Sequence, residues 1–264
     1  VTLHPAGHII GSAQVRVEYE GQVWVASGDY KVEDDGISGA FEPVKCNVFI
    51  SESTFGLPIY KWKPQQEVFD NINQWWENNK ANGKQSVVFG YSLGKAQRIL
   101  KYLDKNIASI YAHTAIYNTQ QALIDFGIDV YPVQHWNPSV TKDETAGAMI
   151  IAPPSAFNTP WLKRFQPFST GYCSGWMQVR GAQRRRNADT GFALSDHADW
   201  PGLLQAVKAT EAEKVYVTHG YQSTFSRYLN EIGSESAEVV TEYGDDEAYD
   251  YAKIIAAGEV VEAA

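Results

Sequence analysis

The chain has 264 residues, a formal net charge of −9 and 44% hydrophobic residues, which is enough apolar material for one large domain or two smaller ones. The acidic balance argues against a protein that coats nucleic acid without regard to sequence, although it leaves room for a local basic channel. No apolar run approaches the about 20 residues of a transmembrane helix, so we expect no membrane partner.

The N-terminal section predicts a loop followed by strands. His4 and His8 are expected in a Pro/Gly-rich loop within the first ten residues. Residues 13–29 alternate apolar and polar side chains, which predicts a β-hairpin with its turn at residues 20–21. The apolar stretch 47–53 predicts a further strand.

Strands and helices alternate through the rest of the chain. The predicted elements are a helix from Pro64 to about Asn82, a strand over 85–89, a helix over 94–103, a strand over 109–113, a helix over 117–127, strands over 129–133, 148–154 and 168–175, a helix from Pro201, a strand over 214–220 and a helix from Tyr221. This order indicates an α/β protein whose middle section has a Rossmann-like rhythm.

Cys46 and Cys173 are far apart in the sequence and have no metal-type spacing. We expect them to be small core residues of a protein kept in a reducing compartment, for which the cytoplasm is favoured.

The segment GYSLGK lies between a predicted strand and a predicted helix. It fails as a phosphate loop, because only three residues separate Gly90 from Gly94. It fits the G-x-S-x-G pattern of a nucleophile elbow, in which Ser92 would act with Asp129 and His219 as a serine hydrolase. The alternative is that the two glycines shape a tight turn whose helix N-terminus holds an anion.

A second constellation is spread along the chain. His8 precedes a strand, whereas Asp29, Glu52, His197 and His219 each follow or end one. Side chains at strand ends can meet at one edge of a sheet, and imidazole nitrogens and carboxylate oxygens are the ligands of hydrolytic zinc sites. The sequence therefore predicts a metal site built from distant segments.

These residues lie in motifs that resemble a known family. HPAGHIIGSAQV, SGDYK, ESTFG, LSDHAD and VTHG occur in the order and spacing of the metallo-β-lactamase superfamily, and specifically of its β-CASP nucleases. Further stretches, such as APPSAFNTPWLKRF and SGWMQVRGAQRRR, resemble the bacterial ligase-associated DNA exonucleases. The resemblance runs from Leu3 to about Gly244.

The resemblance implies part of an αββα metallo-β-lactamase sandwich with an inserted Rossmann-like β-CASP cap. We expect residues 1–58 and 191–245 to form the sandwich domain, residues 59–190 the cap and residues 246–264 an acidic tail. The family's first metal motif, H-x-H-x-D-H, does not occur in the sequence. We therefore expect the N-terminal third of the family's fold to be missing, and this chain by itself to be inactive and to bind metal poorly.

The resemblance also implies a mechanism. Two zinc ions, or manganese ions in their place, would be bridged by Asp29, with His8 on one metal and His219 on the other. The metals would activate water for attack on a phosphodiester. His197, oriented by Glu52, would protonate or stabilise the leaving oxygen.

Lys95, Ser174 and Arg184 are the expected phosphate contacts, and Arg184 begins a run of three arginines. The implied substrate is nucleic acid, with DNA favoured and RNA as the alternative, and a DNA ligase is the implied partner. A non-catalytic scaffold is a further alternative. His4 is expected to brace the His8 loop. Most of the tryptophans Trp24, Trp75, Trp76, Trp161 and Trp176 are expected to pack in the core or the cap, and stacking on a base is the alternative for Trp176.

Overall fold

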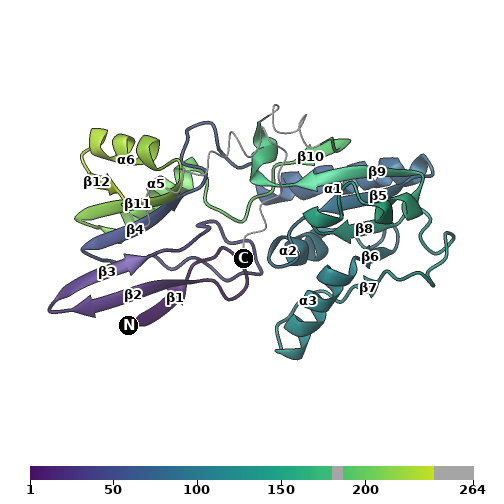
Figure 1. Ribbon diagram of the computed structural model, residues 1–264, viewed down its shortest axis with the longest axis horizontal. Coiled ribbons are helices and arrows are strands. Elements are labelled where there is room, and N and C mark those ends of the chain that lie inside the picture. The colour runs from purple at the N-terminus through teal and green to yellow at the C-terminus, as the bar shows by residue number, and fades with distance from the viewer. Residues whose placement is uncertain (180–186, 241–264) are drawn as a thin grey trace. The chain divides into compact units, whose positions relative to one another are not determined.

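The computed structural model describes residues 1–179 and 187–240, and Arg184 lies outside them. The chain divides into two compact units: unit 1 comprises residues 1–61 and 196–264, and unit 2 comprises residues 62–195 (Figure 1). Among the described residues, none of the helices has the length and apolar character needed to cross a membrane.

Unit 1 is built on a six-stranded sheet with the order β1-β2-β3-β4-β11-β12. Its elements are β1 (Thr2–Pro5), β2 (Ala13–Tyr19), β3 (Gln22–Ala26), β4 (Val48–Ser53), α5 (Trp200–Thr210), β11 (Lys214–Gly220), α6 (Gln222–Glu231) and β12 (Glu235–Glu238). β1, β2 and β3 pair antiparallel, whereas β4 pairs in parallel with both β3 and β11. β4 therefore joins the hairpin to the returning segment of the chain.

Helices α5 and α6 pack on one face of this sheet. Leu203 of α5 and Phe225 of α6 belong to one buried cluster with Phe49 of β4 and Val217 of β11. Asp199 caps α5, since its Oδ1 accepts a hydrogen bond from the Gly202 amide. Burial of these side chains holds the sheet and its two helices together.

The opposite face of the β1–β3 part of the sheet is apolar and exposed. Leu3, Val15, Val17 and Trp24 share this face through their cross-strand pairing, and their exposed fractions lie between 39% and 65%. Trp24 stacks only on Tyr216 of β11, with ring centroids 6.3 Å apart, among the ring pairs of the described residues. Trp24 is therefore an exception to the expectation that the tryptophans pack mostly in the core or the cap.

Unit 2 contains a six-stranded sheet with the order β10-β9-β5-β8-β6-β7, in which every pair is parallel. Its elements are α1 (Gln65–Ala81), β5 (Gln85–Phe89), α2 (Lys95–Tyr102), β6 (Ile110–Ala112), α3 (Thr114–Asp125), β7 (Gln134–His135), β8 (Met149–Ala152), β9 (Phe168–Cys173), β10 (Thr190–Phe192) and the 3₁₀ helices η1 (Pro154–Ala156), η2 (Pro160–Phe165) and η3 (Gly175–Gln178). A parallel sheet of this kind needs cover on both faces.

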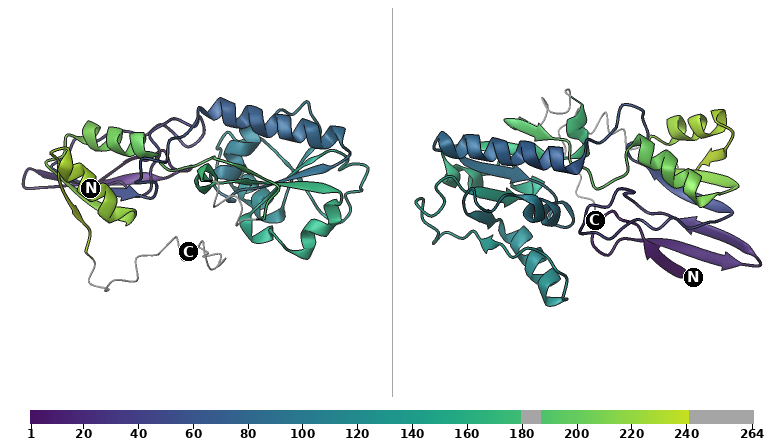
Figure 2. Two further views of the ribbon diagram at one scale, coloured as in Figure 1. Left: turned by 90° about the horizontal axis from the view of Figure 1, so that it is seen from above. Right: turned by 180° about the vertical axis from the view of Figure 1, so that it is seen from behind.

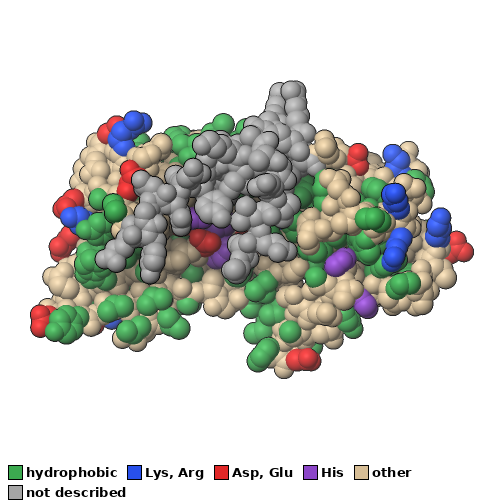
Figure 3. Space-filling view, in the orientation of Figure 1, with side chains coloured by type: hydrophobic (Ala, Val, Ile, Leu, Met, Phe, Trp, Pro, Cys, Tyr) green, Lys and Arg blue, Asp and Glu red, His purple; other side chains and the backbone are tan. Residues whose placement is uncertain are grey.

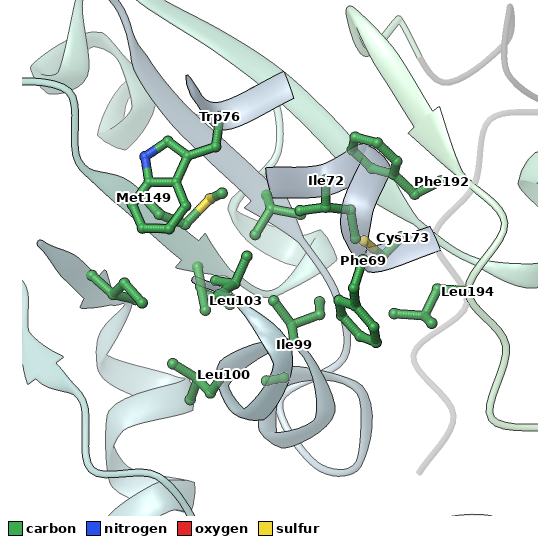
Figure 4. Packing of buried hydrophobic residues seen from close by; sticks show 14 of the residues in the cluster. Phe69, Ile72, Trp76, Ile99, Leu100, Leu103, Met149, Cys173, Phe192 and Leu194 are labelled. Atoms are coloured by element: carbon green, nitrogen blue, oxygen red, sulfur yellow. The ribbon is translucent and has the colours of Figure 1, made fainter. Parts of the chain in front are cut away.

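Both faces of the unit 2 sheet are covered. α1 runs along one side of the sheet (Figure 2) and presents Phe69, Ile72 and Trp76 to it at helical spacing. These side chains pack with Ile99 of α2 and with Met149 of β8 (Figure 4). A separate buried cluster, which includes residues of η1 and η2, covers the other face.

The structure confirms the α/β class and corrects parts of the predicted order. Residues 129–133 form no strand, and β7 comprises only Gln134 and His135. Pro132 lacks the amide donor that a sheet ladder needs, which accounts for the displacement. α3 begins three residues earlier than predicted because His113 Nδ1 accepts a hydrogen bond from the Ala115 amide and caps the helix.

Candidate metal centre

The loop that carries His8 is held by its own backbone and side chains. The sequence led us to expect His4 in this loop, but His4 lies on β1. The hydroxyl of Ser12 accepts hydrogen bonds from the amides of His8 and Ile9 at 3.1 and 3.2 Å. Gly7 has φ +72°, and a Cβ there would lie 2.3 Å from a backbone oxygen, so only glycine fits.

Asp29 comes shortly after β3, and Glu52 lies near the end of the neighbouring strand β4. Asp29 lies three residues after β3, and its side chain is 42% exposed. Glu52 of β4 is 1% exposed, and its carboxylate accepts hydrogen bonds from the amides of Tyr30 at 2.8 Å and Thr54 at 3.3 Å. A buried carboxylate in this position is satisfied by donors that the backbone supplies.

His197 comes from the segment that returns to unit 1. Its Nδ1 lies 3.1 and 3.0 Å from the two oxygens of Glu52, which is a charge-assisted contact in a largely buried place. The next amide, that of Ala198, donates to the Tyr30 carbonyl at 2.7 Å. The returning segment is thereby fixed against the segment that carries Asp29 and Glu52.

His8, Asp29 and His197 converge. One ligand atom from each lies within 4.8 Å of the other two, and His8 Nε2 is 3.9 Å from Asp29 Oδ2. The rings of His8 and His197 have centroids 4.5 Å apart. Figure 3 shows histidine side chains beside an acidic side chain near the middle of the view. Within the described part of the chain, these three residues form the one group of three or more His, Cys, Asp or Glu side chains that could hold a metal ion.

The surroundings shift the pKa values of the two histidines in opposite directions. Burial and the nearby charge of His197 lower the pKa of His8, against the opposing effect of Asp196 and Asp29. Burial also acts to lower the pKa of His197, but the charge and hydrogen bond of Glu52 outweigh it, so the pKa is raised. The same contact lowers the pKa of Glu52 in spite of its burial.

The donor set fits a cation such as zinc or manganese. His8 Nδ1 lies 2.9 Å from the carbonyl oxygen of Asp196, to which it donates as N–H. The lone pair of the neutral ring is then on Nε2, the atom that faces Asp29. A metal-binding histidine characteristically donates its other ring N–H to a carbonyl or carboxylate, and His8 meets that condition.

His219, the third predicted ligand, is not one of the three residues of this group among the described residues. It lies at an irregularity of β11, between Thr218, which pairs with Glu52, and Gly220, which pairs with Ser53. Its backbone has φ +57°, and its carbonyl accepts a hydrogen bond from the Ser53 hydroxyl at 2.6 Å. His219 thus lies one residue before the end of β11, next to the end of β4 where Glu52 lies, and its role as a ligand stays a prediction.

The three predicted phosphate contacts belong to unit 2 or lie outside the described residues. Lys95 is the first residue of α2, is 4% exposed and has its Nζ 5.7 Å from the centre of the Tyr91 ring. Ser174 caps η3, since its hydroxyl accepts from the Trp176 amide. Arg184 falls within residues 180–186, of which the structure gives no description.

Two residues that position the centre were not singled out from the sequence. Ser12 anchors the His8 loop through its hydroxyl, and a serine four residues after a histidine is a signal for such a local turn. The Asp196 carbonyl orients His8 from a distance of 188 residues along the chain, so no local pattern predicts that contact.

The chain is similar in sequence to several known proteins. It is 32% identical over 237 residues to a "Probable DNA ligase" of Opitutus terrae, which covers 89% of this chain and 23% of that protein. It is 34% identical over 109 residues to "Cleavage and polyadenylation specificity factor subunit 3" of Dictyostelium discoideum, covering 40% of this chain and 14% of that protein. It is 31% identical over 106 residues to "Endoribonuclease YSH1" of Saccharomyces cerevisiae, covering 39% and 13%.

The chain thus spans less than a quarter of the length of these relatives. No protein-family model matches it. Among solved structures, a protein of unknown function from Enterococcus faecalis is similar in fold, with a TM-score of 0.57 and 11% identity over 92% of this chain and 62% of that one.

Proposed function

Because this chain belongs to the β-CASP family, we propose that it carries the catalytic centre of a metal-dependent nuclease that hydrolyses phosphodiester bonds in nucleic acid. The observation that supports this most directly is the convergence of His8, Asp29 and His197 from three separate segments. Since the motifs resemble ligase-associated DNA exonucleases, we assign DNA as the first substrate and a DNA ligase as the partner.

In this proposal His8 Nε2 and the carboxylate of Asp29 hold the metal, and His219 is a further ligand. When bound, the metal supplies Lewis acidity, which polarises the phosphoryl group and activates water. His8 is suited to the ligand role because its lowered pKa keeps the ring neutral near pH 7, and because Asp196 fixes its tautomer.

We assign His197 the role of proton donor. Its raised pKa favours the doubly protonated ring, which has no lone pair for a metal but has a proton to give to a leaving oxygen. Glu52, through its contact with Nδ1, stabilises the positive charge and fixes the orientation of the ring. In this assignment Glu52 acts through His197 and does not contact the substrate.

The proposed domain arrangement follows the resemblance: unit 1 belongs to an αββα sandwich, and unit 2 is the β-CASP cap. Lys95, Ser174 and Arg184 then contact phosphates of the strand. RNA is the alternative substrate, and the relatives named as an endoribonuclease and as a cleavage and polyadenylation factor favour it.

Metal binding and activity test the two roles separately. We expect His8→Ala and Asp29→Asn to lower zinc affinity in a chelator-competition titration, whereas His197→Gln retains zinc. With the intact gene product, the same three variants should abolish hydrolysis of labelled single-stranded DNA, duplex DNA or RNA, and EDTA should abolish it in the wild type.

Two outcomes would contradict this proposal. Activity that survives EDTA while Ser92 reacts with a fluorophosphonate probe would favour the serine hydrolase alternative. Unchanged zinc affinity in His8→Ala would show that zinc does not bind at the centre described above. The relative rates on DNA and RNA decide between the two substrates.

A further inference from the structure

Unit 2 contains a cavity with an aromatic floor and a basic rim. Its volume is about 250 Å³, and it lies between η2 and the segment that links β7 to β8. Trp136 and Phe165, which are 7% and 1% exposed, form the aromatic floor, and their ring centroids are 5.0 Å apart. The walls are therefore fixed by the buried cluster on this face of the sheet.

The charged side chains that line the cavity are both cations. Arg164 and Lys142 are exposed at the rim, and within the described parts of the chain neither forms an ion pair with a carboxylate. Two acidic residues, Asp143 and Glu144, follow Lys142 in the sequence but do not line the cavity, and the Glu144 carboxylate accepts hydrogen bonds from the amide and hydroxyl of Thr141 at 2.7 Å each. A rim of this kind concentrates anions locally in a protein whose net charge is −9.

Arg164 also has a defined place over the aromatic floor. Its guanidinium carbon lies over the Trp136 ring, 5.3 Å from the ring centre, which is a cation–π arrangement. A guanidinium plane supported in this way is a stacking surface for a nucleobase. Lys142, as a flexible point charge on the same rim, suits a phosphate.

We propose that this cavity binds one nucleotide unit, with the base stacked on Arg164 and the phosphate at Lys142. The volume lies below the about 300–1,000 Å³ of sites for drug-sized ligands, so a single ring system fits better than an extended ligand. The unit comes either from a free mononucleotide or from single-stranded nucleic acid. This site uses none of the residues of the metal centre, and it stands whether or not the chain hydrolyses phosphodiesters.

Binding measurements in EDTA test the site without the metal centre. The probes are dAMP by calorimetry and a fluorescein-labelled ten-nucleotide oligodeoxyadenylate by anisotropy, with inorganic phosphate and adenosine as partial ligands. We expect Arg164→Gln to weaken binding about tenfold or more, since it removes the cationic plane on which the base is proposed to stack. For the oligonucleotide, Lys142→Gln should also reduce the slope of log K against log salt by about 0.7, the value for one phosphate contact on a single strand.

Lys163→Gln is the matched control. Lys163 is exposed, precedes Arg164 on η2 and does not line the cavity, so its loss removes the same charge without the proposed contact. Both substituted side chains at the rim are exposed, so the variants should fold, and circular dichroism checks this.

Loss of dAMP binding identifies a free nucleotide as a ligand, whereas loss of oligonucleotide binding alone identifies a strand. Equal binding by Arg164→Gln and wild type in both arms, or by inorganic phosphate and dAMP, overturns the proposal.

Discussion

Replacement of Glu52 by glutamine should disturb both the stability of unit 1 and the protonation of His197. The carboxylate has two oxygens that accept from the amides of Tyr30 and Thr54 and from His197 Nδ1. Glutamine keeps the shape but offers one oxygen, so its NH₂ group must face at least one buried N–H donor. An unsatisfied buried donor costs about 1–3 kcal/mol of unfolding free energy.

The sign of the pH dependence follows from the two pKa shifts. The pKa of His197 is raised in the folded protein, so its contribution to stability is present below the unfolded value of about 6.5 and is lost as pH rises through the folded value. The pKa of Glu52 is lowered, so its contribution is lost as pH falls through the folded value. The difference in unfolding free energy between wild type and Glu52→Gln should therefore be larger at pH 6 than at pH 9.

Urea denaturation measures this difference, and NMR titration of the His197 ring protons measures its pKa. In Glu52→Gln the effect of burial remains without the carboxylate, so the pKa of His197 should fall below its wild-type value. Glu42→Gln is the control, since Glu42 contacts His4 at 2.9 Å in the same manner but is 53% exposed. A folded Glu52→Gln protein in which the pKa of His197 stays raised would refute the reasoning.

Three shorter predictions follow from other parts of unit 1. Gly7→Ala should destabilise the protein by more than about 1 kcal/mol and weaken zinc binding at His8, because its Cβ meets backbone, whereas Gly11→Ala, with nothing within 4 Å, should cost only the backbone strain. Zinc affinity should rise as the pH is raised toward about 6.5 and change little above it, because the lowered pKa of His8 confines proton competition for Nε2 to more acidic solution; an affinity that still rises between about pH 7 and 8 in a calorimetric titration would contradict this. Trp24→Thr should change unfolding free energy by about 0.5 kcal/mol or less, yet reduce fluorescence of the apolar dye ANS, because the ring lies on an exposed apolar face; unaltered dye binding would count against that face as the dye's site.

Elements with strong periodicity could be predicted from the sequence. The apolar spacing of Phe69, Ile72 and Trp76 predicts α1, and the structure shows these side chains buried against the sheet. Short elements at the sheet margins could not be predicted, because β7 has two residues and the polar sequence of β12 carries no apolar alternation. Their pairing depends on neighbouring strands rather than on local preference.

The candidate site, too, could be predicted from the sequence only in part. His8, Asp29, Glu52 and His197 could be selected because each adjoins a predicted strand end, and the structure brings these four together. The approach of His197 to His8 could not be derived in this way, since it depends on how the segment that follows unit 2 packs against the sheet of unit 1. Contacts through backbone carbonyls, such as that of Asp196, carry no residue-type signature at all.

The position of β4 has a consequence for the newly made chain. β4 pairs on one side with β3, made just before it, and on the other with β11, whose residues emerge only after the whole of unit 2. Glu52 and Thr218, its partner on β11, are 166 positions apart, which corresponds to about 8–33 s of translation at 5–20 residues per second. During that interval one edge of β4, with the carboxylate of Glu52, lacks its neighbour and stays open to pairing with the strands of other chains.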